Sequence, residues 1–217
     1  CETLLGVDES IGAVLDFLDE RGLASSTLVI YMGDNGFAFG EHGLIDKRHF
    51  YEESVKVPFL LRCPELTRGG EVIDKMIQNI DVAPTILAYA GLQSPEYFHG
   101  LSLLPLLTEK QVTWRDRIFY EYYWEYSFPQ TPTMHGVRTD RYKYIRYHGI
   151  WDTNEFYDLE QDPYEMNNLI ASEEHQELIK SLAGEVYDWL ESTKGMQIPL
   201  KRTIMHRWGD HRNVGVY

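Results

Sequence analysis

The chain opens with a periodic pattern of apolar and polar positions that is typical of an amphipathic helix. Over residues 3–20, apolar side chains recur every three or four positions and acidic side chains lie off that stripe. Arg21 and Gly22 then supply a basic last turn and a glycine stop. The apolar run from Thr27 to Met32 is short enough for a strand. A helix followed by such a strand is half of a βαβ unit, so the pattern predicts a parallel sheet with helices on its faces.

A second apolar run, from Val57 to Leu61, predicts another short strand that ends in a loop containing proline and glycine. Asp81 is a good helix cap, with Pro84 in the first turn and Gly91 as the stop. The stretch that follows is rich in turn residues. We therefore place a boundary near residue 110, between an α/β part at 1–110 and a smaller α+β part at 111–217.

The second half of the chain has a different pattern. Aromatic residues alternate with polar ones in the stretches "RIFYEYYWEY", "MHGVRTDRYKYIRYHG" and "NEFYDLEQDP". Such alternation is typical of antiparallel strands that turn one face to a core. Residues 173–193 then show an apolar stripe at helical spacing. We expect a small antiparallel sheet with one covering helix, followed from Gly195 by an extended tail.

Composition narrows the choice of partners. The 217 residues include 34 acidic and 20 basic side chains, a formal net charge of −14. This balance argues against nucleic acid or an anionic membrane as the main partner, and it favours a divalent cation. No window approaches the roughly 20 apolar residues of a membrane span. Because the chain starts in a helical pattern without an initiator Met, we expect it to be a piece of a longer protein.

The stretch "YMGDNG" places two hard oxygen ligands at the end of the first predicted strand. The Asp34 carboxylate and the Asn35 amide suit Ca²⁺ or Mg²⁺ rather than a soft metal. Ligands bind beyond the carboxyl ends of strands in open α/β sheets, which is where this pair lies. Asp-Asn-Gly is also an ordinary turn sequence, so the turn stays an open alternative.

The next stretch, "GEHGLIDKRHFYEES", gathers side chains that could handle an oxyanion. Lys47 and Arg48 can donate to tetrahedral oxygens, and His42 could protonate a leaving oxygen. The alternative is a loop that carries charges because it is solvated.

Taken in order, these segments resemble the sulfatase family. The resemblance rests on the strand before "DNG", the "GEHG" loop, Lys47, "YEESVKVP", "NIDVAPTILAYAGL", "HGVRTDRYKYI" and the closing "YDLEQDPYEMNNL". The closing segments look closest to enzymes that remove a 6-sulfate from N-acetylglucosamine, including mucin-desulfating types. The resemblance implies the later part of an alkaline-phosphatase-like mixed sheet with flanking helices, followed by the small antiparallel sheet.

The resemblance also implies roles for particular residues. Asp34 and Asn35 match the family's second pair of calcium ligands, and Lys47 matches the lysine that contacts the sulfate. His42 falls in a loop that lines the pocket in relatives. His135 and Arg138 are expected to reach the sugar, with a strand-end histidine and a solvated arginine as the equal alternative.

Parts of the family's catalytic apparatus do not occur in this sequence. Sulfatases use a formylglycine made from Cys or Ser in a Cys/Ser-x-Pro-x-Arg setting, beside a first pair of metal-binding aspartates. "CPELTR" at Cys63 to Arg68 has the wrong spacing. In the parent protein a formylglycine hydrate would attack sulfur, and we expect the 217 residues alone to be inactive. A periplasmic, secreted or lysosomal location is implied by resemblance, and the oligomeric state stays open.

Two rival interpretations remain. Phosphodiesterases and phosphonate monoester hydrolases share the fold, although "DNG" followed by one Lys favours a single calcium over two metals with histidine ligands. A non-catalytic carbohydrate-binding module would use aromatic side chains as a stacking platform: Tyr122, Tyr123, Trp124, Tyr126 and Trp151. Aromatic residues in strands more often belong to a core.

Overall fold

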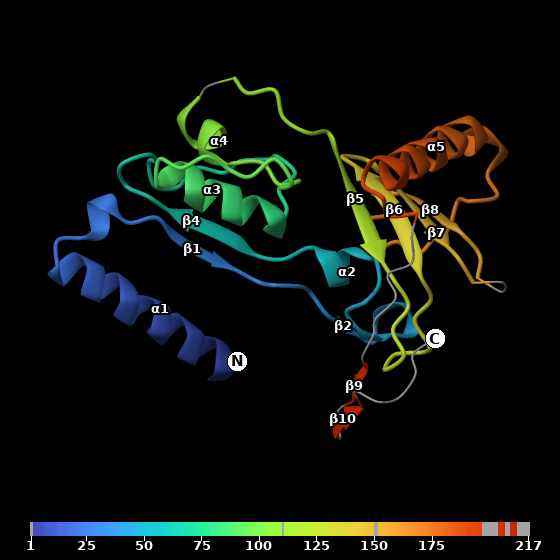
Figure 1. Ribbon diagram of the computed structural model, residues 1–217, viewed down its shortest axis with the longest axis horizontal. Helices are drawn as coiled ribbons and strands as arrows, with labels where there is room; N and C mark the ends of the chain where they lie inside the picture. The colour runs from blue at the N-terminus through green and yellow to red at the C-terminus, as the bar shows by residue number, and fades with distance from the viewer. Residues whose placement is uncertain (1, 110, 150–151, 197–203, 207–208, 212–217) are drawn as a thin grey trace. The chain divides into compact units, whose positions relative to one another are not determined.

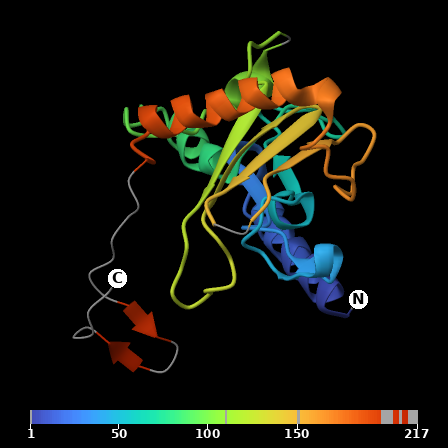
Figure 2. The same cartoon turned by 90° about the vertical axis from the view of Figure 1, so that its right-hand side faces the viewer.

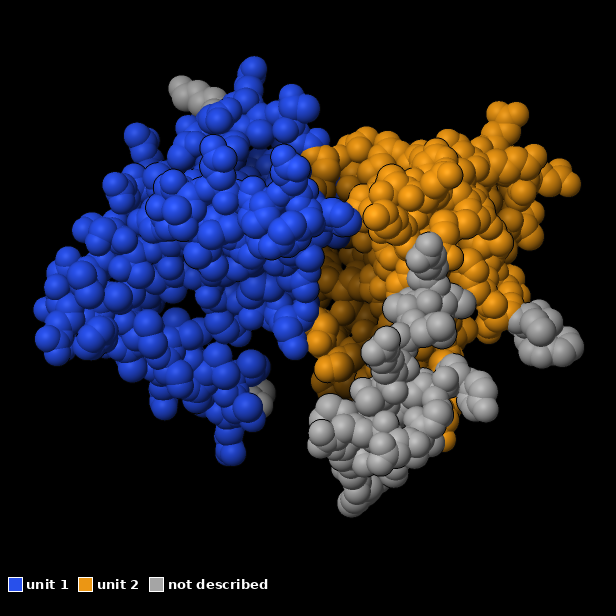
Figure 3. Space-filling model, in the orientation of Figure 1, with its two compact units in different colours: residues 1–34, 57–114 blue, residues 35–56, 115–217 orange. Residues whose placement is uncertain are grey.

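The computed structural model describes residues 2–109, 111–149, 152–196, 204–206 and 209–211, the last two stretches by backbone alone. Two compact units make up the chain (Figure 3). Unit 1 contains residues 1–34 and 57–114, and unit 2 contains residues 35–56 and 115–217. The domain boundary predicted near residue 110 stays a prediction. Within the described part, no helix is both long and apolar enough to cross a bilayer.

Unit 1 contains two paired strands and the helices that flank them (Figure 1). Its elements are α1 Glu2–Glu20, η1 Ala24–Ser26, β1 Val29–Met32, β4 Phe59–Arg62, η3 Asn79–Asp81, α3 Val82–Tyr89 and α4 Leu104–Thr108. Of these, α1, β1, β4 and α3 lie where the apolar pattern predicts them, whereas α4 lies in the stretch expected to be rich in turns. Asp81 caps the η3 turn through the backbone N–H of Gln78 and also binds the N–H of Leu101, rather than capping α3 by its side chain.

The expected parallel pairing is wrong for these two strands. β1 and β4 are antiparallel, with Val29 opposite Arg62 and Met32 opposite Phe59. The reason is the path of the chain, because residues 35–56 leave unit 1 at the end of β1 and return to it at the start of β4. A parallel pair needs a crossover to the opposite end of the sheet, and this excursion supplies none.

Unit 2 contains the predicted antiparallel sheet and its covering helix. The strands β5 Arg117–Tyr122, β6 Met134–Thr139, β7 Tyr142–Tyr147 and β8 Glu155–Asp158 pair in sequence order. Helix α5 Gln176–Ser192, after the η4 turn Glu173–His175, lies across one face of this sheet (Figure 2). The core beneath it is formed by Val137, Tyr144, Phe156, Ile179, Leu182, Val186 and Leu190.

The other face of this sheet is covered by residues 35–56. They form β2 Ala38–Phe39, η2 Glu41–Gly43, β3 Ile45–Asp46 and α2 Glu52–Val55. Phe50 and Tyr51 pack here with Met134 and Ile145. Gly136 allows the close approach, because a Cβ there would lie 2.6 Å from Phe50 Cδ1 and 2.7 Å from the Tyr144 carbonyl oxygen. Both faces of the sheet are therefore buried.

The predicted extended tail is described only in part. Residues 197–203, 207–208 and 212–217 lie outside the described residues. β9 Ile204–His206 and β10 Gly209–His211 form an antiparallel pair.

Candidate functional site

Asp34 and Asn35 follow β1 directly, as the sequence predicts. The Asn35 amide nitrogen donates to the Gly36 carbonyl oxygen at 2.8 Å, and the Gly36 N–H donates to the Ser54 carbonyl at 2.8 Å. A carboxylate beside an amide oxygen fits the hard-ligand chemistry of calcium, which takes about six to eight oxygens. Two residues supply only part of such a set. The calcium assignment therefore stays a prediction that needs ligands from elsewhere.

Lys47 lies next to Asp46, whose side chain is fixed by hydrogen bonds within unit 2. The Asp46 carboxylate accepts hydrogen bonds from the Lys47 backbone N–H (2.7 Å), from Arg48 Nη1 (2.6 Å) and from the Thr131 hydroxyl (3.3 Å). Burial acts to raise the pKa of Asp46, but the bonds from Lys47 and Arg48 hold it below its usual value. Lys47 itself is exposed, and its amine makes no ion pair with the described residues. It is thus available to an anionic ligand.

His42 occupies a left-handed backbone position, φ 54°, in the "GEHG" loop. Its ring stacks on Tyr51 at 3.8 Å between centroids, and its Nε2 lies 3.4 Å from Glu53 Oε2. These contacts hold the imidazole against other residues of unit 2, with 10% of the side chain exposed. A substrate contact by His42 stays a prediction, and the structure gives its ring a packing role.

His42, Glu53 and Glu165 bring three potential metal-ligating atoms within 4.8 Å of one another. However, Glu165 Oε1 also lies 2.7 Å from the ammonium group of Lys143. A fixed cation therefore already balances the charge at this position, and it would repel a divalent ion. We interpret the group as part of an ion-pair network rather than as a metal centre.

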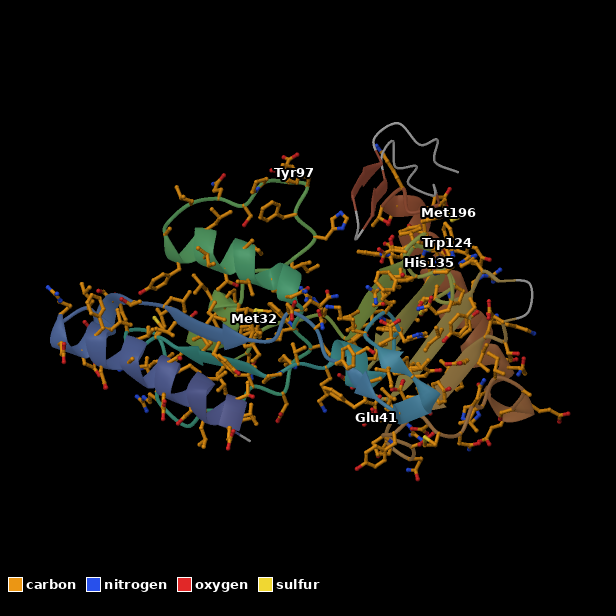
Figure 4. The ribbon with its side chains drawn as sticks, turned by 90° about the horizontal axis from the view of Figure 1, so that it is seen from below. Met32, Glu41, Tyr97, Trp124, His135 and Met196 are labelled. Carbon is orange, nitrogen blue, oxygen red and sulfur yellow. The ribbon has the colours of Figure 1, made fainter. Side chains whose placement is uncertain are left out.

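A cavity of about 690 Å³ opens at one end of the unit 2 sheet. Its walls come from the loop 123–133, from the ends of β6 and β7, and from α5 and the turn after it. Figure 4 shows Trp124, His135 and Met196 gathered around it. Aromatic rings and a few polar groups in a concave site of this size are typical of a small-ligand pocket.

His135 lines this pocket and is paired with a second histidine. Its Nδ1 lies 2.7 Å from His148 Nε2, and its ring meets Tyr123 edge to face. Burial lowers the pKa of His135 to about 4, and the neighbouring His148 adds to the effect. Burial, with a smaller effect of Arg146, also lowers the pKa of His148. Both rings are therefore neutral at pH 7, and one donates a hydrogen bond to the other. Sugar binding by His135 stays a prediction, and its place in the pocket agrees with it.

Arg138 does not line the pocket. Its Nε lies 3.1 Å from Glu52 Oε1, and its Nη1 donates to the Thr139 carbonyl oxygen at 2.9 Å. The predicted sugar contact is untested, but the guanidinium is engaged by Glu52. Several titratable residues of unit 2 were missed by sequence reasoning: Glu52, Lys143, Arg146, His148 and Glu165. Glu52, Lys143 and Glu165 carried a signal only as members of the "YEES", "RYKYI" and "DPYE" segments.

The platform proposed for a sugar-binding module is divided in the structure. Tyr123 and Trp124 line the pocket. Tyr122 instead packs against the core beside Phe50. Trp151 lies outside the described residues.

Comparisons with known proteins give a consistent result. The family model described as "N-sulphoglucosamine sulphohydrolase, C-terminal" matches residues 40–192. An N-acetylglucosamine-6-O-sulfatase from Bacteroides thetaiotaomicron is 36% identical over 214 residues, which are 97% of this chain and 38% of that protein. A solved structure in complex with its substrate, D-glucosamine-2-N,6-O-disulfate, is similar with a TM-score of 0.83 and 34% identity, over 90% of this chain and 40% of that one.

A phosphonate monoester hydrolase of Agrobacterium radiobacter has a TM-score of 0.74 at 24% identity, over 88% of this chain and 39% of that one. At that identity the likeness concerns the fold alone. The chain spans about two fifths of the length of these relatives.

Proposed function

Because this chain belongs to the sulfatases, we propose that the protein containing it hydrolyses the sulfate ester of a sulfated amino sugar, with N-acetylglucosamine-6-sulfate as the preferred substrate. The observation that carries the proposal is the connection between Lys47 and the pocket within unit 2. Both the candidate sulfate contact and the candidate sugar pocket belong to one compact unit.

Three contacts tie the Lys47 segment to the loop that forms the pocket wall. Asp46 accepts the hydroxyl of Thr131, Arg48 Nε lies 3.6 Å from Glu125 Oε1, and the Arg48 guanidinium lies 3.2 Å from the ring centroid of Phe128. Because these contacts fix the segment, Lys47 keeps a constant position relative to the pocket. Such preorganisation is what recognition of a charged group on a sugar ring requires.

In the proposed reaction, Lys47 neutralises charge on the sulfate oxygens, and the pocket with His135 holds the sugar. The ammonium group gains most where negative charge increases in the transition state. Asp34 and Asn35 would supply two ligands to calcium, with the remaining ligands and the formylglycine supplied from outside these residues. Calcium, when bound, polarises the sulfate oxygens as a Lewis acid. The 217 residues alone are expected to have no turnover.

The test uses the whole protein and follows sulfate release from N-acetylglucosamine-6-sulfate. We expect Lys47→Ala to lower kcat by about 10²- to 10³-fold, the usual cost of losing one electrostatic stabiliser. Lys180→Ala removes an exposed lysine from α5 and should leave the rate unchanged. Asp34→Ala should lower calcium affinity measured by calorimetry, while unfolding transitions show that the fold is retained.

The same assays separate the rival functions. Faster hydrolysis of a phosphonate monoester, such as 4-nitrophenyl phenylphosphonate, than of the sulfate ester would favour the phosphonate hydrolase. Sugar binding without turnover by the whole protein would favour the binding module. Full activity of Lys47→Ala would contradict the proposed sulfate contact.

A further inference from the structure

A lysine is completely buried in the middle of the unit 2 sheet. Lys143 lies on β7, and its side chain is 0% exposed. Its ammonium group lies 2.7 Å from Glu165 Oε1, 2.8 Å from Glu52 Oε1 and 2.7 Å from the Phe50 carbonyl oxygen. The ammonium group thus donates a hydrogen bond to the Phe50 carbonyl and makes close ion pairs with two carboxylates.

Glu165 is held in a conformation that few residues other than glycine adopt. Its φ is +52°, and its side chain is also 0% exposed. Glu165 Oε2 accepts a hydrogen bond from the backbone N–H of Glu52 at 2.7 Å. Local turn geometry alone does not explain why a carboxylate residue occupies this left-handed position.

Lys143 and Glu165 contact the main chain of the segment that follows Lys47. Lys143 binds the carbonyl oxygen of Phe50, and Glu165 binds the N–H of Glu52. The Phe50 ring adds a third hold, because it lies against Gly136 and stacks on Tyr120 at 4.6 Å. Backbone contacts determine the path of a segment more directly than side-chain contacts do. The segment is thereby fixed at residues 50–52, just as Asp46 fixes it on the other side of Lys47.

We propose that Lys143 and Glu165 are positioning residues that hold the segment carrying Lys47 in the geometry that sulfate binding requires. This proposal rests on the proposed function and assigns a role to residues that do not line the pocket. Stability alone is a weak explanation for the network, because apolar residues of similar volume usually replace a buried ion cluster without loss. Apolar side chains could not, however, bind the Phe50 carbonyl and the Glu52 N–H.

The main experiment is a double-mutant cycle in the whole protein. Lys143→Met/Glu165→Met should keep a cooperative unfolding transition but lower kcat/KM for the sulfate ester by at least about tenfold. In a Lys47→Ala background, the same pair should change kcat/KM by less than about twofold, because the residue being positioned is gone. Lys180→Met, which replaces an exposed lysine on α5, is the control and should have no effect.

A second measurement does not depend on activity. Glu165→Gln keeps the side-chain volume, and it should speed hydrogen exchange at the amides of residues 47–52 by at least about tenfold, while Lys180→Met should not. Unchanged exchange in Glu165→Gln would overturn the positioning role, even if the apolar pair fails to fold. An equal loss of kcat/KM with and without Lys47 would also overturn it. Full activity of Lys47→Ala would instead contradict the proposed function, and the exchange data would still decide whether the network orders the segment.

Discussion

The contact between Gly136 and Phe50 leads to a quantitative prediction about unit 2. A Cβ at position 136 would lie 2.6 Å from Phe50 Cδ1 and 2.7 Å from the Tyr144 carbonyl oxygen. Neither neighbour can move away easily. Phe50 is 1% exposed and stacked on Tyr120, and the carbonyl belongs to the adjacent strand of the sheet. Gly136→Ala should therefore overpack the core.

The expected cost follows from the usual range for overpacking, about 1–3 kcal/mol. Three contacts below 3.0 Å in a site buried on all sides place Gly136→Ala in the upper half of that range, at about 2–3 kcal/mol. The added methyl group also pushes on the segment that carries Lys47. We therefore expect activity to fall along with the free energy of unfolding.

The assay is urea unfolding of the whole protein, followed by the fluorescence of its tryptophans. Gly184→Ala provides a matched control, because position 184 lies on α5 with no atom within 4 Å of an added Cβ. That control should stabilise the protein by about 0.5–1 kcal/mol through helix propensity. A Gly136→Ala protein within about 0.5 kcal/mol of wild type would show that the packing argument is wrong.

Two further predictions concern charge and the pocket. Burial acts to raise the pKa of Glu52, but Lys143 and Arg138 lower it to about 2 from 4.5, so Glu52 contributes stability above pH 4.5 that is lost as the pH falls toward 2. The contribution is on the order of 3 kcal/mol. Glu52→Gln should therefore weaken the loss of unfolding free energy as the pH falls through the acidic range. Glu177→Gln, at an exposed position, should leave this pH dependence unchanged. Trp124→Ala should raise KM about 2- to 12-fold with kcat little changed, because it removes an aromatic contact worth about 0.5–1.5 kcal/mol. Tyr164→Ala, which lies outside the pocket, should leave KM unaltered. A lower kcat for Trp124→Ala with KM unchanged would contradict the pocket assignment.

The elements with one buried face were predictable from the sequence. The stripe in α5 contains Ile179, Leu182, Val186 and Leu190, all of them buried, and helical periodicity reports such a face directly. Aromatic alternation also predicted the antiparallel strands, but it did not predict that residues 35–56 cover their second face. The pairing of β1 with β4 was not predictable, because it depends on where residues 35–56 go between the two strands.

The site was predictable only as far as short motifs reach. Lys47 and the Asp34–Asn35 pair could be proposed from the sequence because each lies in a compact segment with a chemical reason for its residue types, and their roles stay predictions. The role of Lys143 has no local signal, since its acceptor at Phe50 lies 93 residues earlier in the chain. Arg138 was interpreted as a substrate contact, yet its partner Glu52 lies 86 residues earlier in the chain. His42 was interpreted in the same way, and its contact with Glu53 depends on how the stretch between them folds back.

The excursion of residues 35–56 into unit 2 also bears on the order in which the protein folds during synthesis. Phe50 and Tyr51 leave the ribosome well before β6 and β7, the strands that later cover them. Until those strands are made, this segment has apolar side chains and no sheet to bury them, a state prone to wrong association. Slow translation between residues 57 and 134 would prolong that exposure. Chaperone binding to the nascent chain is therefore expected around residues 44–55, and it should end once β7 and Glu165 have emerged.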